Sequence, residues 1–401
     1  MQMAKTIKKK VVLAFSGGLD TTYCAVYLSK NFDVYAIYVN TGGATKNDIL
    51  KISSHAKNIG VKSFVSVDVV KNYYSQCVRY LIFGNVLKNN TYPLSVSAER
   101  VFQAKAVVDY ANKINADAIS HGSTGAGNDQ IRFDMIFRIL APGKKIIAPI
   151  RDLKLSRNDE IEFLKSHRVK MDFQKAKYSI NKGLWGTSIG GVETLTSNLP
   201  LPESAFPNQL KRNDETKVEL EFKRGELIKI NGKKFSSVNA ILFLQNLCND
   251  YAIGRDMHVG DTVIGIKGRV AFEAGAPMVI IKSHHALEKH TLTKWQLYWK
   301  DSLSIWYGNF LHDGNFLDPT MRDIEKFFES TQQNVSGKVF VKLLPYRFII
   351  EGIYSEHDLM SPVFGSYGEM NNAWSGEDAK GFSVIASNQT LIYNKINKKK
   401  K

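Results

Sequence analysis

The chain has 401 residues, 44% hydrophobic and 23% charged, and its 54 Lys and Arg against 38 Asp and Glu give a formal net charge of +16 at pH 7. This composition predicts a soluble globular protein of two or more domains, and no apolar stretch reaches the ~18–20 residues of a membrane-spanning helix. Cys24, Cys77 and Cys248 are odd in number and widely spaced, which excludes a disulfide framework and predicts a cytoplasmic protein.

Short apolar runs alternate with helical patterns over the first 165 residues. Strands are expected at residues 11–15, 34–39, 63–67, 116–120 and 145–148, and helices at residues 21–30, 47–58, 69–87, 98–114 and 129–140. This alternation predicts an α/β domain with a parallel, doubly wound sheet. Ligands of such sheets lie at the carboxyl ends of the strands.

The most informative motif is VVLAFSGGLDTT, at residues 11–22. An apolar run leads through two glycines to a helix, so unpaired N–H groups and the positive end of the helix dipole meet in a tight turn. Such a turn binds phosphate, although the motif is neither a Walker A loop nor G-x-G-x-x-G. The alternative is an ordinary strand-turn-helix junction.

A second polar cluster, HGSTGAGNDQIR, occupies residues 121–132, directly after an expected strand. Its glycines allow close approach of a nucleotide, while amide, carboxylate and guanidinium groups together suit an amino acid. Arg132 could hold an α-carboxylate in bidentate fashion and Asp129 could pair with an α-ammonium. The alternative is a polar loop that caps the following helix through Asn128 or Asp129.

From about residue 170 the pattern changes to that of an α+β domain. Antiparallel strands are expected over residues 217–230, with turns at Arg224-Gly225 and Asn231-Gly232. Further elements are expected as a helix at 237–248, strands at 262–272 and 279–282, and a hairpin of 338–343 with 346–353 that turns at Leu344-Pro345. A final amphipathic helix begins at Ser375 and packs either on a partner subunit or on its own domain.

The two polar motifs carry a resemblance. SGGLDT resembles the pyrophosphate loop of the N-type ATP pyrophosphatases, and AFSGGLDTT together with HGSTGAGNDQIRF resembles the argininosuccinate synthase family. Weaker matches follow at residues 148–152, 177–179 and 265–269. The resemblance implies an adenine nucleotide alpha hydrolase-like domain (1–168), an α+β synthetase domain (169–360) and a C-terminal oligomerisation helix with a basic tail (361–401), in a cytoplasmic homotetramer.

The resemblance also implies the reaction. The implied enzyme is a ligase that condenses citrulline with aspartate through a citrullyl-adenylate, using ATP and Mg²⁺, in arginine biosynthesis. The implied ATP contacts are Ala14, Phe15, Ser16, Gly17, Gly18, Leu19, Asp20, Thr21, Thr22, Val39 and Gly122. The implied citrulline contacts are Tyr92, Ser97, Asn128, Arg132, Ser179 and Ser188, and the aspartate contacts are Thr124, Asn128 and Asp129.

Catalysis is expected to depend on Ser16, Asp20 and Asp129. Asp20 is expected to orient the loop or a Mg²⁺ ion rather than to act as a base. The acceptor of the proton that aspartate's ammonium loses is not evident from the sequence.

The chain departs from the family pattern at several positions near the implied citrulline contacts. The usual Ala-Arg-Pro is Glu99-Arg100-Val101, and the acidic residue after the second serine is missing from SIGG. The glutamate and tyrosine that many members use on citrulline fall near Gly260 and at Phe272. Their replacements are expected to be His258, Asp261 or Glu273, unless citrulline's amino-acid end is held differently.

Other readings are weaker. A tRNA-thiolation enzyme would share the SGGxD motif and would be consistent with the charge of +16. Such an enzyme requires a CxxC or paired catalytic cysteines, which the sequence does not show, so a nucleic-acid partner is not expected. No dedicated metal site is expected, because His284 and His285 would point to opposite faces of a strand. The aromatic residues Trp295, Tyr298, Trp299, Trp306 and Tyr307 have helical spacing and are expected in the core or in a subunit interface.

Overall fold

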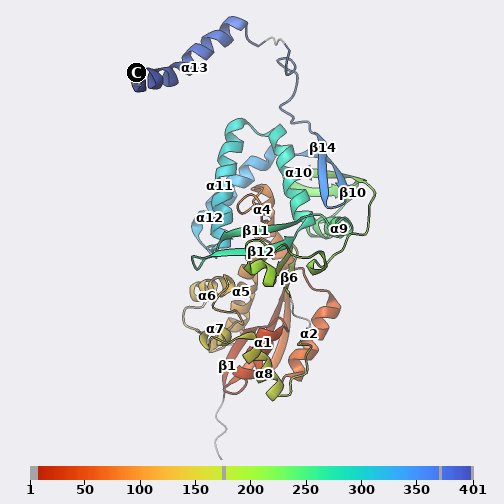
Figure 1. Ribbon diagram of the computed structural model, residues 1–401, viewed down its shortest axis with the longest axis vertical. Helices are drawn as coiled ribbons and strands as arrows, with labels where there is room; N and C mark the ends of the chain where they lie inside the picture. Colours follow the sequence, from red (N-terminus) through yellow and green to blue (C-terminus); the bar gives the residue numbers. More distant parts are fainter. Residues whose placement is uncertain (1–7, 174–177, 370–372, 399–401) are drawn as a thin grey trace, which may run out of the picture. The chain divides into compact units, whose positions relative to one another are not determined.

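The computed structural model describes residues 8–173, 178–369 and 373–398. The chain divides into two compact units, residues 1–356 and 357–401. The smaller unit contains helix α13 (Gly376–Asn397), which Figure 1 labels together with many of the elements of the larger unit. As the sequence predicts, Ser375 caps α13, and its side chain and that of Asp378 bond each other's backbone N–H groups in a capping box.

The first half of the larger unit is built on the expected parallel sheet. Its strands are β1 (Lys9–Ala14), β2 (Phe32–Asn40), β3 (Ser63–Asp68), β4 (Ala118–Ser120) and β5 (Lys145–Ile147), in the order β3-β2-β1-β4-β5. All neighbouring pairs are parallel. The strand order reverses between β1 and β4, which in doubly wound folds marks the ligand site.

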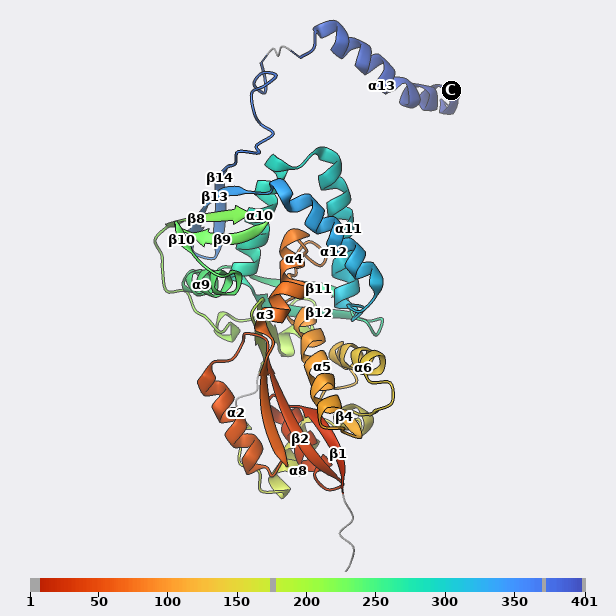
Figure 2. The ribbon, with the colours of Figure 1, turned by 180° about the vertical axis from the view of Figure 1, so that it is seen from behind.

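Helices cover both faces of this sheet (Figures 1 and 2). They are α1 (Leu19–Leu28), α2 (Lys46–Asn58), α5 (Ser95–Lys113), α6 (Asp129–Leu140), α7 (Pro149–Asp152) and α8 (Arg157–Ser166). Alternate residues of β1 serve opposite faces: Val12 packs in the same core as α5, whereas Val11 and Leu13 pack with α1.

The single helix expected at residues 69–87 is interrupted. It consists of α3 (Val70–Tyr73), a π-helical turn η1 (Tyr74–Val78) and α4 (Arg79–Phe83). The buried residues Tyr73, Cys77 and Leu81 still follow one another at intervals of four, so the apolar pattern identified the helix but not the wider turn within it.

The second half of the larger unit holds two antiparallel sheets. One has the order β11-β12-β7-β6 and the other β10-β9-β8-β13-β14. Their strands are β6 (Ser179–Gly183), β7 (Gly186–Gly190), β8 (Thr216–Lys223), β9 (Glu226–Ile230), β10 (Lys233–Lys234), β11 (Arg255–Asp261), β12 (Lys267–Glu273), β13 (Gly337–Leu344) and β14 (Arg347–Tyr354). The turns at Arg224-Gly225 and Asn231-Gly232 are confirmed, whereas the last hairpin turns at Pro345-Tyr346, one residue later than expected.

Helices pack against these sheets, and short 3₁₀ turns join some of the elements. The helices are α9 (Ser237–Asp250), α10 (Gly275–Thr291), α11 (Lys294–His312) and α12 (Pro319–Thr331), and the turns are η2 (Val192–Leu195), η3 (Glu203–Ala205) and η4 (Gln332–Asn334).

Two expectations for this half are corrected, and for a third the burial differs among the residues. Residues 279–282 lie inside helix α10, because a short apolar run fits a buried helix as well as a strand. Residues 262–266 form a turn closed by the Thr262 N–H on the Ile266 carbonyl, and only Lys267–Glu273 is strand. On α11, Tyr307 is core, but Trp295, Tyr298, Trp299 and Trp306 are each about 60% exposed.

A buried polar network ties α10 and α11 to the end of α4. The Lys300 ammonium contacts the Glu288 carboxylate at 2.8 Å and donates to the Phe83 carbonyl at 2.6 Å, and both charged side chains are fully buried. His284, expected on a strand, lies in α10 and bonds Asn85 and Gln332 through its two ring nitrogens. Neither nitrogen is therefore available to a metal ion.

We expect Lys300→Met to destabilise the protein by about 3–5 kcal/mol, because it leaves the Glu288 carboxylate buried without its cation. Thermal or denaturant unfolding measures this change. The control is Lys326→Met. The Lys326 ammonium lies 4.0 Å from Asp323 Oδ1, and both side chains are exposed, so this ion pair is weak. The control should shift stability by no more than about 0.5 kcal/mol. Equal effects of the two substitutions would contradict the assigned role of the buried pair.

Candidate functional site

A cavity of about 890 Å³ opens at the carboxyl ends of the parallel strands. The phosphate-loop residues and the loop after β4 line one side, and residues of β6, β7, β11 and β12 line the other. The two loops meet closely, since a Cβ on Gly122 would lie 3.1 Å from the Thr21 side chain and 3.3 Å from the Asp20 backbone. Both sequence motifs therefore border a single cavity.

The glycine turn has the geometry of an anion site. Gly17 has φ +78°, a conformation that glycine adopts without strain, and Gly18 is the N-cap of α1. No side chain caps this helix, so the N–H groups of its first turn remain available to a ligand. The hydroxyl groups of Ser16 and Thr21 lie 3.1 Å apart beside them.

Most of the expected ATP contacts line the cavity. These are Ala14, Phe15, Ser16, Gly18, Leu19, Asp20, Thr21, Val39 and Gly122. Gly17 shapes the turn from behind, and Thr22 is fully buried with its hydroxyl 2.9 Å from His55 Nε2. Thr22 thus joins α1 to α2 rather than facing the cavity.

Asp20 sits at the phosphate loop beside a second acid, Glu160 of α8. Burial raises the pKa of Asp20. Burial and the charge of Asp20 raise the pKa of Glu160 to about 8. The two groups therefore carry less negative charge at neutral pH than two free carboxylates, which favours an anionic ligand in the turn.

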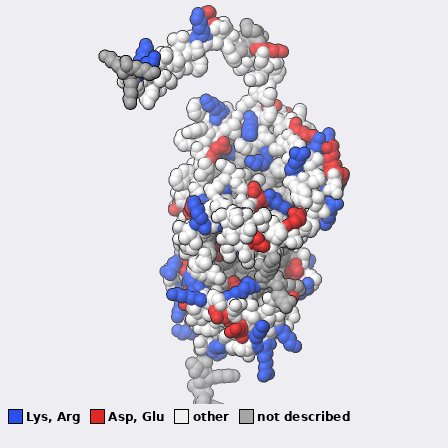
Figure 3. All heavy atoms as spheres, in the orientation of Figure 1, with Lys and Arg blue, Asp and Glu red and all other residues white. Residues whose placement is uncertain are grey.

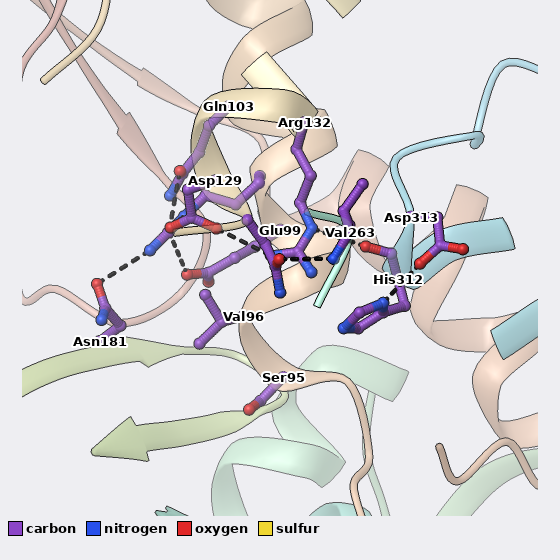
Figure 4. A network of polar contacts seen from close by, with 12 residues as sticks. Ser95, Val96, Glu99, Gln103, Asp129, Arg132, Asn181, Val263, His312 and Asp313 are labelled. Atoms are coloured by element: carbon purple, nitrogen blue, oxygen red, sulfur yellow. Dashed lines mark hydrogen bonds and ion pairs between the residues drawn. The ribbon is translucent and has the colours of Figure 1, made fainter. Parts of the chain in front are cut away.

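Asp129, at the start of α6, is held by two arginines, of which Arg132 is labelled in Figure 4. Its Oδ2 accepts from Arg100 Nε at 2.8 Å and its Oδ1 from Arg132 Nη1 at 2.9 Å. Burial alone would raise the pKa of Asp129, but the charges of Arg100 and Arg132 outweigh it and hold that pKa below its ordinary value. Asp129 is thus a firmly ionised carboxylate with lone pairs left for a ligand.

Arg132 makes more hydrogen bonds within the protein than the sequence suggested. Its Nε donates to the His312 carbonyl at 2.9 Å and its Nη1 to Asp129, so two of its three nitrogens are already used within the protein. The remaining N–H groups are on Nη1 and Nη2, so a bidentate contact with a substrate carboxylate is possible only along the Nη1–Nη2 edge of the guanidinium.

Arg100 is the residue whose importance the sequence analysis missed. It is 9% exposed and donates to four acceptors from three elements: Glu99, Gln103, Asp129 and Asn181 of β6. The available signal was its place between two departures from the family pattern. Asn181 and Gln103 gave no signal, because ordinary polar residues acquire a role only through the fold.

Glu99, which precedes Arg100, is buried at the cavity wall. Its Oε1 accepts from Arg100 Nη1 and its Oε2 from the Thr41 hydroxyl, both at 2.8 Å. Burial outweighs these partners and raises the pKa of Glu99 to about 7. The environment thus raises the pKa of Glu99, whereas it lowers the pKa of Asp129.

Asn128 and Thr124 complete the loop. Asn128 holds the N-cap position of α6 without a capping bond from its side chain, and its Oδ1 instead accepts from the Val263 N–H at 2.9 Å. The capping alternative therefore does not account for Asn128, whose side chain links the loop to the second half of the unit. Thr124 lines the cavity and is exposed.

Tyr92, Ser97, Asn128, Arg132, Ser179 and Ser188, expected at citrulline, all line the cavity. The Tyr92 hydroxyl also accepts from the Val96 N–H at the start of α5. Lys177, from one of the weaker sequence matches, lies outside the described residues.

The structure distinguishes the three expected replacements for the missing family residues. Glu273 is 1% exposed and pairs with Arg255 at 3.1 Å, and Asp261 is exposed and pairs with Lys267. His258 and Asp261 both line the cavity, and the buried Nδ1 of His258 has no hydrogen-bond partner among the residues that the structure describes. Gly260 makes room for this ring, because a Cβ there would lie 2.6 Å from His258 Nε2.

Two general findings concern the described part of the chain. None of its helices combines the length and the apolar character needed to cross a bilayer. Among the same residues, no group of three or more His, Cys, Asp or Glu is arranged to hold a metal ion.

Comparison with known proteins gives the family. The model described as the arginosuccinate synthase N-terminal HUP domain matches residues 10–170, and that of the C-terminal domain matches residues 178–393. Proteins named argininosuccinate synthase are similar to this chain: that of Sulfolobus acidocaldarius is 34% identical over 96% of this chain and 99% of its own length. Those of Methanocaldococcus jannaschii and Staphylococcus aureus are 33% and 35% identical over 98% and 96% of this chain, and 100% and 97% of their own lengths.

These similarities cover both halves of the cavity, whereas they give no support to a tRNA-thiolation enzyme. On the face in Figure 3, Lys and Arg are interspersed with Asp and Glu rather than gathered into one basic surface. The chain belongs to the argininosuccinate synthase family.

Proposed function

We propose that this chain condenses citrulline with aspartate, splitting ATP into AMP and pyrophosphate. The observation that carries the proposal is the single cavity shared by a phosphate-binding helix terminus and the Asp129 cluster. An enzyme that adenylates one amino acid and joins it to another needs both features within reach of one intermediate.

In the first step, the ureido oxygen of citrulline attacks the α-phosphorus, and the bond to pyrophosphate breaks. Negative charge builds on the leaving pyrophosphate, where the first-turn N–H groups of α1 and the hydroxyls of Ser16 and Thr21 can stabilise it. In the second step, aspartate's amine attacks the activated carbon and AMP leaves. Asp129 would hold the ammonium of aspartate beside Thr124 and Asn128 before that attack.

Mg²⁺ would enter with ATP. Magnesium is commonly bound by one or two carboxylates together with substrate phosphates and water, so a site without a cage of protein ligands suits it. Asp20, which lines the cavity at the phosphate loop, fits the role of the protein carboxylate. The ion would neutralise charge on the phosphates, while the turn orients them.

We assign the amino-acid end of citrulline to the wall that contains His258 and Gly260. Burial lowers the pKa of His258 to about 4, with the charges of His312 and Lys88 adding to the effect, so its ring is neutral at pH 7. A neutral imidazole with an unpartnered Nδ1 can hydrogen-bond either the carboxylate or, as the other tautomer, the ammonium.

We further propose a homotetramer in the cytoplasm, with the division 1–168, 169–360 and 361–401. Helix α11 exposes an apolar face that includes Trp295, Trp299 and Trp306, and such faces are typical of subunit interfaces. The apolar side chains Phe382, Ile385 and Ile392 of α13 are also exposed. Light scattering should give four times the chain mass of 45.1 kDa, and a monomer at micromolar concentration would reject the tetramer.

Purified protein with ATP and Mg²⁺ should release pyrophosphate only when citrulline is present, and aspartate should be consumed in equal amount. The readout is pyrophosphate together with argininosuccinate. Reactions without citrulline, and reactions in which tRNA replaces both amino acids, serve as controls. Pyrophosphate release that is indifferent to citrulline but stimulated by tRNA would contradict the proposal.

Asp129→Asn and His258→Ala form a matched pair of variants. Loss of the Asp129 charge should raise KM for aspartate about 10- to 100-fold, because a charge-assisted hydrogen bond is lost. Loss of the His258 ring should raise KM for citrulline about 2- to 10-fold. Each variant should leave KM for the other amino acid within about twofold. Exchanged effects, or equal effects on both substrates, would reject the assignment.

A further inference from the structure

The proposed reaction requires a base that the phosphate loop does not supply. Aspartate binds as an ammonium, which has no lone pair, so one proton must leave before the nitrogen can attack the adenylate. General-base catalysis needs a group in the cavity with a pKa near the working pH and close to the substrate amine.

The other titratable groups beside Asp129 are poorly suited. Asp129 itself has a lowered pKa, so it pairs with an ammonium without taking its proton. His121 uses both ring nitrogens, Nδ1 as the acceptor from the Ser123 N–H and Nε2 on Asp134. His258, with a pKa of about 4, is a weak base and lies on the wall assigned to citrulline.

Glu99 is the neighbouring carboxylate. Arg100 donates from Nη1 to Glu99 Oε1 and from Nε to Asp129 Oδ2, each at 2.8 Å. The two carboxylates are therefore bound to different nitrogens of one guanidinium. Both line the cavity. Figure 4 shows Glu99, Asp129 and Arg132 in one network at this point of the cavity.

The place of Glu99 is built by the surrounding residues. Thr41, which follows β2, donates its hydroxyl to Oε2. Gly183, at the end of β6, leaves the space that the carboxylate fills, since a Cβ at that position would lie 2.1 Å from Oε2. A side chain at 183 would force the carboxylate out of this position.

We propose that Glu99 is the general base that takes the proton from the ammonium of aspartate held by Asp129. The inference rests on the proposed function. The two carboxylates would have different roles because their environments differ. Asp129 would stay charged and bind the ammonium, and Glu99 would change its protonation state.

The step balances. The ammonium gives one proton to the Glu99 carboxylate, and the freed lone pair forms the C–N bond to the activated ureido carbon. The C–O bond to the adenylyl phosphate breaks, and AMP leaves with that electron pair. The attacking nitrogen gives its second proton to the departing phosphate, so the products are a guanidinium, a neutral Glu99 and singly protonated AMP.

The test separates adenylation from capture of the amine. Glu99→Gln keeps the shape, and its amide oxygen can still accept from Arg100. Citrulline-dependent exchange of labelled pyrophosphate into ATP, measured without aspartate, should change less than about threefold, whereas kcat for argininosuccinate formation should fall about 100-fold. Glu99→Asp should recover part of the lost rate. Glu162→Gln, at an exposed position of α8, is the matched control.

The pH profile gives a second readout. Glu99 must be ionised to accept a proton, so wild-type kcat/KM for aspartate should fall as pH drops through about 7, whereas Glu99→Gln should lose this inflection. The charged and titratable groups facing Glu99 are Arg100 on its own helix, Asp129 on α6, Tyr38 on β2, Tyr73 on α3 and Tyr92 before α5. The tyrosines have raised pKa values, and the shifted pKa values of Arg100 and Asp129 also lie well away from 7.

Three results would overturn the proposal. Wild-type rates of condensation in Glu99→Gln would remove Glu99 from proton transfer, and an unchanged pH inflection would assign the titration to another group. Loss of exchange and condensation together in Glu99→Gln would show a structural role. Failure of the wild-type protein to catalyse citrulline-dependent exchange would instead refute the proposed function itself.

Discussion

A buried guanidinium must satisfy its donors within the protein, and this requirement for Arg100 organises the site. Losing water is expensive for a charge unless it is paired and hydrogen-bonded. Arg100 meets the need with acceptors from its own helix, from Asp129 and from Asn181 of β6. One side chain therefore fixes the parallel-sheet half against the antiparallel half at the cavity, and its charge lowers the pKa of Asp129 and opposes the rise that burial gives the pKa of Glu99.

Much of the fold follows from the sequence because its signals are local. Strand-helix alternation gives the parallel sheet, and the glycines of the SGG motif give a turn at the end of β1. The same rules fail at residues 279–282, because four apolar residues fit a fully buried helix as well as a strand. On α11, spacing shows that the aromatic residues share a face but not whether the core or another chain covers it.

The site was predictable where motif residues are contiguous and unpredictable where partners are distant in sequence. The loops around Ser16 and Asp129 could be recognised from their own composition. The pairing of Asn181 with Arg100 could not, and neither could the engagement of Arg132 by the His312 carbonyl, since each depends on packing across elements. At Gly260, burial separates two of the candidates: Glu273 is bound to Arg255, and His258 occupies the space beside Gly260.

Two glycines of the cavity wall share one property. Gly260 and Gly183 each leave room for a polar side chain from another position, His258 in one case and Glu99 in the other. The volume that a side chain at each glycine would occupy is filled by the neighbouring polar group, so the wall stays packed while that group faces a ligand.

The close approach at Gly183 couples positions 99 and 183. Because a Cβ at 183 would lie 2.1 Å from Glu99 Oε2, a side chain there would require the Glu99 carboxylate to be shortened or moved from its bonds to Arg100 and Thr41. Shortening Glu99 alone would leave a small void, which the fold can absorb at modest cost. The effects of substitutions at 99 and 183 on stability are therefore expected to be non-additive.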